Sequence, residues 1–388
     1  MSEVVVAGIG QAPVGEHWDI SLRELAYRAI DAARKDAQAL WPDALFAGNM
    51  LAPVVSRQAQ VATLIADFAG LTGIEAATVE AGGASGGAAL RLGYLAVASG
   101  EVDVCLVVGV EKMTDRTPAE VEAALSSSID SDYETIQGMT HTAQAALLMQ
   151  RYLYEYGAPR ESFAAFPVSA HANAASNPNA MFRNTIRMDH YNQAGPVCTP
   201  LNMLDIAPAA DGAAAIILTR PALLPPDQPY PAVRISGSSM ASGSIALHDH
   251  PDPLSFDAAR TSIEKACQQA GITPSDVDLF ELHDAYSIYT ALSLEATGLA
   301  RRGEGWRLAQ DGQIGLHGRW PISTFGGLKA RGNPGGATGV YQAVEAVLQL
   351  RQAAGSNQIT GARRALIQCL AGPSSNAVTH VLERMDSW

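Results

Sequence analysis

The stretch VEAGGASGGAALRLGYLAVASGEVDVCLVVGVEK, residues 79–112, decides the fold of this chain. The β-branched residue Val79 precedes a tight turn at Gly82 and Gly83, and small residues then begin a helix. Apolar residues in 90–98 recur at helical spacing, and the run 104–110 is continuously apolar. The stretch therefore predicts a strand, a sharp turn, a helix and a second strand.

Composition and charge limit the class of protein. The 388 residues, 47% of them hydrophobic, suffice for two packed domains or one duplicated core. With 26 basic and 39 acidic residues, the formal charge is -13. Such a surface repels phosphate backbones and anionic membranes, so neither nucleic acid nor a membrane is expected as a partner. The sequence shows no apolar run of roughly 20 residues and no signal peptide, which predicts a soluble cytoplasmic protein.

The four cysteines do not form a metal or disulfide pattern. Cys105, Cys198, Cys267 and Cys369 are scattered along the chain without CxxC spacing, so reduced thiols are expected. The HDH sequence at 248–250 lies in a stretch rich in Pro and Asp, with no further ligand at a suitable spacing. We interpret it as a solvated loop, and no metal site is predicted.

Strand and helix signals occur twice in the same order. A strand at 4–9 precedes the capping-box pair Ser21 and Glu24, which begins a helix with one apolar face. The second half repeats this order with a strand at 232–236, a helix at 257–271 and a strand at 277–282. The apolar runs 102–110 and 364–370 are a further matching pair of strands. The chain is therefore predicted to be an internal duplication.

The region between the two repeats differs in composition. Residues of about 113–200 are richer in polar and aromatic side chains, and they include a predicted helix at 142–156, which indicates an inserted cap. A strand at 213–219 returns to the first core, and the Pro-rich run 223–231 is the predicted linker. We therefore divide the chain into an N-terminal half, 1–225, and a C-terminal half, 226–388. The fold class is α/β, with a sheet that is buried on both faces.

Three further segments, together with residues 79–112, resemble thiolases over essentially the whole chain. They are ELHDAYS at 281–287, GGLKARGNPGGATGVYQ at 326–342 and ALIQCLAGPSSNAVTHVLE at 365–383. The first is similar to the HDAF-type motif of archaeal and sterol-carrier-type thiolases, which include acetyl-CoA acetyltransferase-like proteins. The resemblance implies the thiolase fold, a duplicated five-layer α-β-α-β-α core.

The resemblance also implies that this chain lacks the nucleophile and its base. In the thiolase pattern VEA-x-C-A-S-G the cysteine position is Gly83 here, so no acyl-enzyme can form at this position. In the family loop G-H-P-x-G-A-T-G the histidine that deprotonates the cysteine is replaced by Asn333, which is not a base near neutral pH. Loss of the cysteine side chain is expected to leave extra room near Gly83 for a bulkier acyl group.

Several residues in these segments are candidates for catalysis. By resemblance, His283 is the donor to the thioester oxygen; the alternative is a strand-end histidine that bonds a neighbouring loop. Cys369 falls at the position of the family's acid/base cysteine, so it is either a proton donor or a small core residue. Tyr286 and Tyr341 are candidate acids or bases, with packing as the alternative. Ser85 could replace the nucleophile, but helix capping is the favoured role.

Backbone groups of the two glycine turns are expected to hold the substrate. The resemblance places the amides of Ala371 and Gly372 at the oxyanion hole, and Gly335 and Gly336 in the loop under the substrate. The glycines of 332–339 also suit a tight turn with no ligand.

The resemblance implies acyl-CoA chemistry through a stabilised enolate. The predicted function is an acyltransferase or carbon–carbon bond enzyme without the usual cysteine acyl-enzyme. One alternative is a retro-aldolase acting on 3-hydroxyacyl-CoA thioesters, and another is a non-catalytic acyl-CoA-binding or scaffold subunit. Coenzyme A is expected as part of the substrate, with no tightly bound cofactor. A homodimer or tetramer is expected, together with a small zinc-ribbon and OB-fold partner protein.

Overall fold

The computed structural model describes residues 2–225 and 227–386, and its main feature is a nine-stranded mixed sheet in the order β3-β2-β4-β7-β1-β8-β11-β10-β9. The strands are β1 (Val5–Gln11), β2 (Ala44–Gly48), β3 (Glu75–Val79), β4 (Val104–Glu111), β7 (Gly212–Thr219), β8 (Val233–Ser242), β9 (Leu279–Glu281), β10 (Arg364–Ala371) and β11 (Asn376–Arg384). The helices are α1 (Leu22–Asp36), α2 (Val61–Phe68), α3 (Ser85–Ser99), α4 (Pro118–Leu125), α5 (His141–Tyr156), α6 (Ala165–Ala174), α7 (Met188–Gln193), α8 (Asp257–Ala270), α9 (Ser287–Ala296), α10 (Gly305–Gln310) and α11 (Thr338–Leu350).

The strand pairing repeats, which confirms the predicted duplication. In the first half β1 and β7 are antiparallel, β7 and β4 are antiparallel, and β4 and β2 are parallel. In the second half β8 and β11, β11 and β10, and β10 and β9 follow the same sequence of orientations. Each half also places one helix after its first strand, α1 or α8, and one before its central strand, α3 or α11. The two half-sheets meet where Val5 and Val6 pair with β8.

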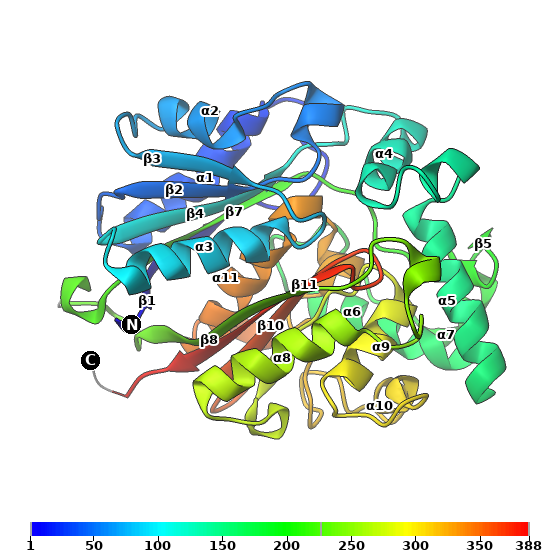
Figure 1. The fold of residues 1–388 in the computed structure, drawn as a ribbon. Helices are drawn as coiled ribbons and strands as arrows, with labels where there is room; N and C mark the ends of the chain where they lie inside the picture. Colours follow the sequence, from blue (N-terminus) through cyan, green and yellow to red (C-terminus); the bar gives the residue numbers. More distant parts are fainter. Residues whose placement is uncertain (1, 226, 387–388) are drawn as a thin grey trace.

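Five layers follow from this arrangement. Figure 1 shows α1 and α2 over the outer face of the first half-sheet, α3 and α11 between the half-sheets, and α8 over the outer face of the second. The strands covered on both faces are almost entirely apolar and buried, as in β4 and β7. The predicted five-layer thiolase fold is therefore confirmed.

Glycines in α3 allow this helix to pack closely against its neighbours in the central layer. A Cβ added at Gly86 in α3 would lie 2.7 Å from the carbonyl oxygen of Gly336 and 3.1 Å from the nitrogen of Gly339. A Cβ at Gly93 would lie 2.6 Å from the Val107 side chain. Any side chain at these positions would push α3 away from its neighbours, so the glycines let α3 lie in the middle of the molecule. The turn at Gly82 and Gly83 that precedes this helix is called the elbow below.

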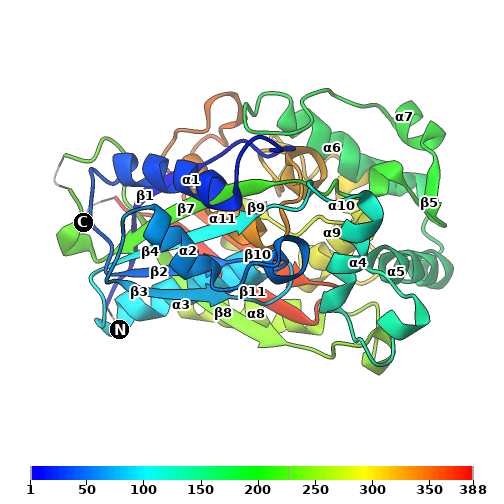
Figure 2. The ribbon, with the colours of Figure 1, turned by 90° about the horizontal axis from the view of Figure 1, so that it is seen from above.

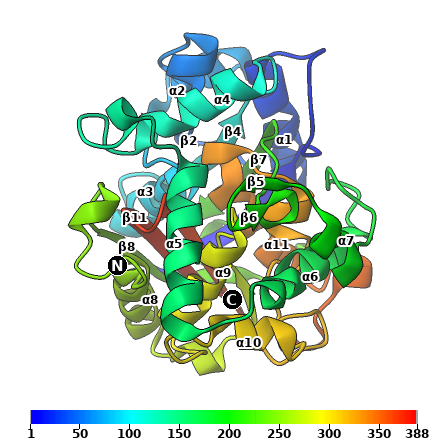
Figure 3. The same cartoon turned by 90° about the vertical axis from the view of Figure 1, so that its right-hand side faces the viewer.

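The polar stretch between the two repeats forms a helical region at one end of the layers. It carries α4, α5, α6, α7 and a small ribbon of β5 (Pro196–Cys198) and β6 (Leu201–Asn202). Figure 2 shows α4, α5 and α7 at the end of the molecule opposite the chain termini, and Figure 3 shows α5 crossing that end. This arrangement places the start of α5 beside the ends of the central strands, where the candidate site lies.

The limits of the two halves stay a prediction. Residue 226, at which we placed the start of the C-terminal half, lies outside the described residues. Within 2–225 and 227–386, no helix combines the length and the apolar character that crossing a membrane requires.

Candidate active site

The predicted sharp turn after β3 is present and is stabilised by Ser85. Gly82 has a φ of +56°, a conformation that favours glycine, and α3 begins at Ser85. The Ser85 hydroxyl donates to the Gly82 carbonyl at 2.6 Å and accepts from the Ala81 amide at 2.9 Å. Because its proton is donated inside the turn, Ser85 stabilises the turn and is not poised as a nucleophile. The favoured role as a helix cap is wrong, since the N-cap of α3 is Ala84 and no side chain caps it.

Position 83 faces the ring of His283. A Cβ added at Gly83 would lie 3.1 Å from Cε1 and 3.4 Å from Nε2 of His283, and 2.7 Å from the carbonyl oxygen of Leu370. The expected extra room near Gly83 is therefore wrong at the Cβ itself, because the Leu370 carbonyl and the imidazole already occupy the surroundings. Glycine at this position places bare backbone against the imidazole.

His283 is a buried, neutral imidazole. It lies just after β9, and the next residue, Asp284, accepts a hydrogen bond of 2.7 Å from the Leu328 amide, which holds the chain in place. Burial lowers the pKa of His283 to about 3, with further lowering from His141 and Arg331. Its Nδ1 has no hydrogen-bond partner within the part of the chain that the structure describes. A neutral imidazole can donate one hydrogen bond from Nε2 toward position 83.

The turn after β10 lies against the turn at Gly82 and Gly83. A Cβ at Gly82 would lie 2.9 Å from the Cβ of Ala371, and Gly372 has a φ of +45°. A Cβ at Gly372 would lie 3.2 Å from Cε1 of His141 and 3.9 Å from Oε1 of Gln144. Both glycine-containing turns and the start of α5 therefore meet beside position 83.

The structure adds His141, which no sequence motif singled out. It is the first residue of α5, whose N-cap Thr140 accepts a hydrogen bond from the Ala143 amide. The side chain is buried, and its Nε2 lies 2.8 Å from the Ser128 hydroxyl. The only signal in the sequence was a lone histidine beside a helix predicted to begin at Thr142, and such a histidine is more often a packing residue than a site residue.

Residues 333–336, called the NPGG loop below, form hydrogen bonds both within the loop and to Glu111. Oδ1 of Asn333 accepts from the Gly335 amide at 3.2 Å and from the Thr338 hydroxyl at 3.4 Å. The Gly336 amide donates to Glu111 at 3.1 Å, and a Cβ at Gly335 would lie 3.1 Å from the Glu111 side chain. Gly335 and Gly336 thus pack on a buried carboxylate, and the amide of Gly336 is already used.

Cys369 lies in strand β10 and directs its sulfur into the central helical layer. Its Sγ donates to Oε1 of Gln342 at 3.0 Å, and it would lie 2.8 Å and 2.7 Å from a Cβ at Gly87 and Gly339. Burial raises the pKa of this thiol to about 12. The structure therefore places Cys369 where the packing alternative expected it and does not bring its sulfur against position 83.

The two tyrosines are separated by the fold. Tyr286 lies near the start of α5, with its hydroxyl 3.2 Å from Oγ1 of Thr142. Tyr341 is completely buried and donates to the carbonyl oxygen of Ala12 at 2.7 Å. Neither phenol supplies one of the three heavy atoms nearest to a Cβ at Gly83, which belong to Leu370 and His283.

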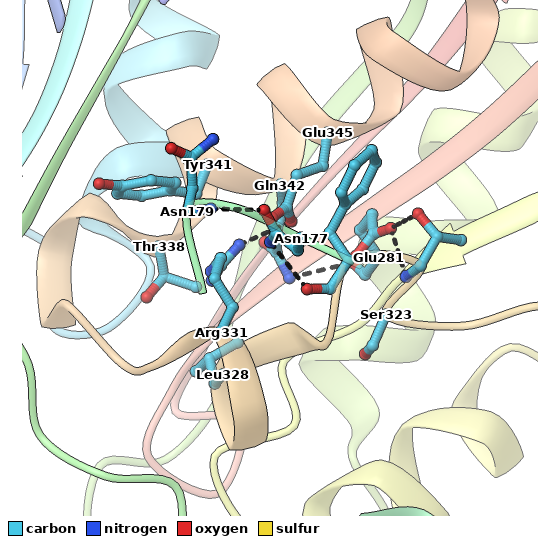
Figure 4. A network of polar contacts seen from close by, with 12 residues as sticks. Asn177, Asn179, Glu281, Ser323, Leu328, Arg331, Thr338, Tyr341, Gln342 and Glu345 are labelled. Atoms are coloured by element: carbon cyan, nitrogen blue, oxygen red, sulfur yellow. Dashed lines mark hydrogen bonds and ion pairs between the residues drawn. The ribbon is translucent and has the colours of Figure 1, made fainter. Parts of the chain in front are cut away.

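A buried ion pair supports the loop that carries Asn333. Arg331 donates to Glu345 at 2.7 Å, and its guanidinium lies 4.9 Å from the centre of the Tyr341 ring. Figure 4 shows this pair beside Glu281, which accepts hydrogen bonds from the amide and hydroxyl of Thr324. Nε and Nη2 of Arg331 have no partner among the described residues, so Glu345 is the one charge that balances this guanidinium directly.

The buried state of His283 makes stability depend on pH. Its pKa of about 3 lies below the ordinary value of about 6.5, so the unfolded chain binds this proton first as the pH falls. The contribution to stability is complete above pH ~6.5 and decreases toward pH ~3, by about 1.4 kcal/mol per pH unit. We expect His283→Gln to remove this loss, so that its urea midpoint depends less on pH than the wild-type midpoint.

An exposed histidine provides the control for this measurement. His317 is exposed, and His317→Gln is expected to keep the wild-type pH dependence of the urea midpoint. If the urea midpoint changed with pH equally in His283→Gln and wild type between pH 6.5 and 4, the imidazole would be charged in the folded protein.

The fold and the meeting point of these turns define a protein of the thiolase fold. The model of the thiolase N-terminal domain matches residues 4–222, and the model of the thiolase C-terminal domain-like family matches residues 239–384. The chain is 41% identical to an acetyl-CoA acetyltransferase of Methanothermobacter thermautotrophicus over 99% of this chain and 100% of that protein. The chain therefore belongs to the thiolase superfamily, whose enzymes act on acyl-CoA thioesters.

Two other similar proteins are parts of larger assemblies by name. The benzoylsuccinyl-CoA thiolase subunit BbsB of Thauera aromatica is 29% identical over 100% of this chain and 99% of its own length. A solved structure titled Ltp2-ChsH2(DUF35) aldolase superposes with a TM-score of 0.82 at 23% identity, covering 98% of both chains. At that identity the likeness shows the fold alone.

Proposed function

We propose that this protein cleaves 3-hydroxyacyl-CoA thioesters by a retro-aldol reaction through an enolate, without an acyl-enzyme. The C3 hydroxyl loses its proton and becomes a carbonyl, and the C2–C3 bond breaks. The electron pair of that bond passes to the thioester and forms an enolate. Return of the proton to C2 gives a shorter acyl-CoA and an aldehyde or ketone, so free coenzyme A is not consumed.

The observation that carries this proposal is the geometry at position 83. A glycine there brings bare backbone against Nε2 and Cε1 of the buried, neutral His283. A donor in such a water-poor place stabilises the negative charge that develops on a thioester oxygen. A nucleophilic side chain is absent from the same place, so the site suits enolate formation and not acyl transfer through a covalent intermediate.

The NPGG loop supports the same reaction class. On the family pattern Asn333 occupies the place of the histidine base, and an amide can donate a hydrogen bond without accepting a proton near neutral pH. Oδ1 of Asn333 is occupied by Gly335 and Thr338, which leaves the amide nitrogen as the donor. One of the similar structures is titled an aldolase, which agrees with a reaction that needs no cysteine.

A partner protein is part of the proposal. BbsB is named as a subunit, and the Ltp2 structure is titled as a complex with a DUF35 protein. We expect a small zinc-ribbon and OB-fold protein of this kind to complete the coenzyme A site. Self-association is expected as well, because β3 pairs only with β2 and leaves one edge of the large sheet open among the described strands.

The test is mass spectrometry of the products formed from a panel of 3-hydroxyacyl- and 3-ketoacyl-CoA thioesters, with and without free coenzyme A. Retro-aldol cleavage predicts a shorter acyl-CoA from a 3-hydroxy substrate in the absence of free coenzyme A. Cleavage of 3-ketoacyl-CoA only when free coenzyme A is present would contradict the proposal and indicate thiolysis. Absence of product with all substrates would favour a non-catalytic acyl-CoA-binding or scaffold subunit.

A further inference from the structure

A second histidine of the site has a defined tautomer. The Ser128 hydroxyl lies 2.9 Å from the Leu125 carbonyl oxygen and 2.8 Å from Nε2 of His141. A hydroxyl has one proton, and a carbonyl can only accept, so Ser128 donates to Leu125. Ser128 must then accept from His141, which puts the ring proton on Nε2. Nδ1 of His141 therefore carries a free lone pair.

The surroundings of His141 place this lone pair at the site. Nδ1 would lie 3.6 Å from a Cβ at Gly372, in the turn that packs against the elbow. Ser128, which holds the ring, would lie 3.7 Å from a Cβ at Gly82. His141 is therefore held beside both turns that meet at position 83, and it is near enough to His283 that its protonated form lowers the pKa of that histidine.

Several residues around this nitrogen are partly exposed to solvent. Gly83, Ser128, Thr142 and Gly372 are half-buried, whereas the two imidazole rings behind them are buried. Burial also lowers the pKa of His141, so that the ring is neutral near pH 7. A neutral imidazole with a free nitrogen is the form that accepts a proton.

Three other titratable side chains in this region already form hydrogen bonds within the protein. Tyr341 and Cys369 bond within the core, and burial raises the pKa of both. The nearby carboxylate of Glu134 accepts from the Gln144 side chain at 3.0 Å and from the Leu247 amide at 2.9 Å. His283 is also neutral and its Nδ1 has no partner among the described residues, but that nitrogen is fully buried and its Nε2 faces position 83. We therefore take His141 as the candidate base.

The geometry points to His141 as the base that takes the proton of the C3 hydroxyl, an assignment that rests on the retro-aldol function proposed above. Nδ1 accepts the proton as the C3 carbonyl forms and the C2–C3 bond breaks. The enolate oxygen accepts a hydrogen bond from Nε2 of His283. The imidazolium of His141 then returns its proton to C2, which restores both histidines and balances the reaction.

The experiment compares three variants with 3-hydroxyacyl-CoA thioesters that the wild-type protein cleaves. His141→Gln keeps an amide nitrogen that can donate to Ser128 and removes the basic lone pair. It is expected to lower kcat by about 10²- to 10⁴-fold with little change in KM. His141→Ala leaves a space at the ring position, and added imidazole is expected to restore part of its activity. His317→Gln, at an exposed position, is the control that retains wild-type kcat.

The outcomes separate this assignment from the function on which it rests. Loss of activity in both His141 variants, with rescue of His141→Ala by imidazole, supports the assignment. A wild-type kcat for His141→Gln, or a folded His141→Ala whose loss imidazole does not reverse, overturns the role of His141 and leaves the retro-aldol function standing. Wild-type protein that cleaves no 3-hydroxyacyl-CoA thioester overturns both.

Discussion

Replacing His283 by alanine is expected to lower kcat for a 3-hydroxyacyl-CoA thioester by about 10²- to 10³-fold, the usual effect of losing one donor to a developing oxyanion. The imidazole faces position 83 without an intervening side chain and is buried, so water cannot readily take its place. His283→Asn retains a donor and is expected to fall between alanine and wild type. The measurement is steady-state formation of the shorter acyl-CoA, with thermal melting to verify that the variants are folded.

A second buried histidine provides the matched control. His380 in β11 has its Nε2 3.0 Å from the carbonyl oxygen of Gly87, inside the central layer. His380→Asn removes a buried imidazole of the same kind and is expected to change the melting temperature more than kcat. Equal losses of kcat in His283→Ala and His380→Asn would mean that packing, and not the donor, explains the effect.

Removing Arg331 is expected to produce the largest loss of stability. Arg331→Met leaves the fully buried carboxylate of Glu345 without its cation, and breaking a buried pair in this way costs about 3–5 kcal/mol. Burial raises the pKa of Glu345 and Arg331 lowers it, so without the guanidinium the carboxyl group must either stay charged with no partner or take up a proton. Urea denaturation at fixed protein concentration measures the change in the free energy of unfolding.

Two comparisons make this measurement specific. The double variant Arg331→Met with Glu345→Leu removes both charges and is expected to recover much of the loss, since no buried charge is left uncompensated. The pair Arg260 and Glu264 is exposed, and Arg260→Met is expected to cost about 0.5 kcal/mol or less. If Arg331→Met were no more destabilising than Arg260→Met, the buried pair would not support the loop that carries Asn333.

Much of the fold could be predicted from the sequence because its signals are local. Alternating strand and helix patterns and the matching order of elements in the two halves predicted an α/β fold with an internal duplication, and the resemblance to thiolases added the five layers that the structure shows. The identities of Gly83 and Asn333 are also read directly from the chain, and they restrict the chemistry wherever the fold places them, because neither residue can act as a nucleophile or a base.

The direction of individual side chains was decided only by the tertiary structure. The strand β10 is apolar and buried on both faces, so its sequence could not tell whether Cys369 points toward the site or into the packing of α3 and α11. The structure directs it into the packing, where glycines at 87 and 339 make room for the sulfur.

The sequence by itself determined the elements, their duplication and the identities of residues 83 and 333. Only the tertiary structure brought His141, the first residue of α5, beside Gly372 in the turn that follows β10. The physical reason is that hydrophobic periodicity and turn propensity act between near neighbours in the chain. The contacts of a site depend on how distant elements pack, and no local pattern encodes them.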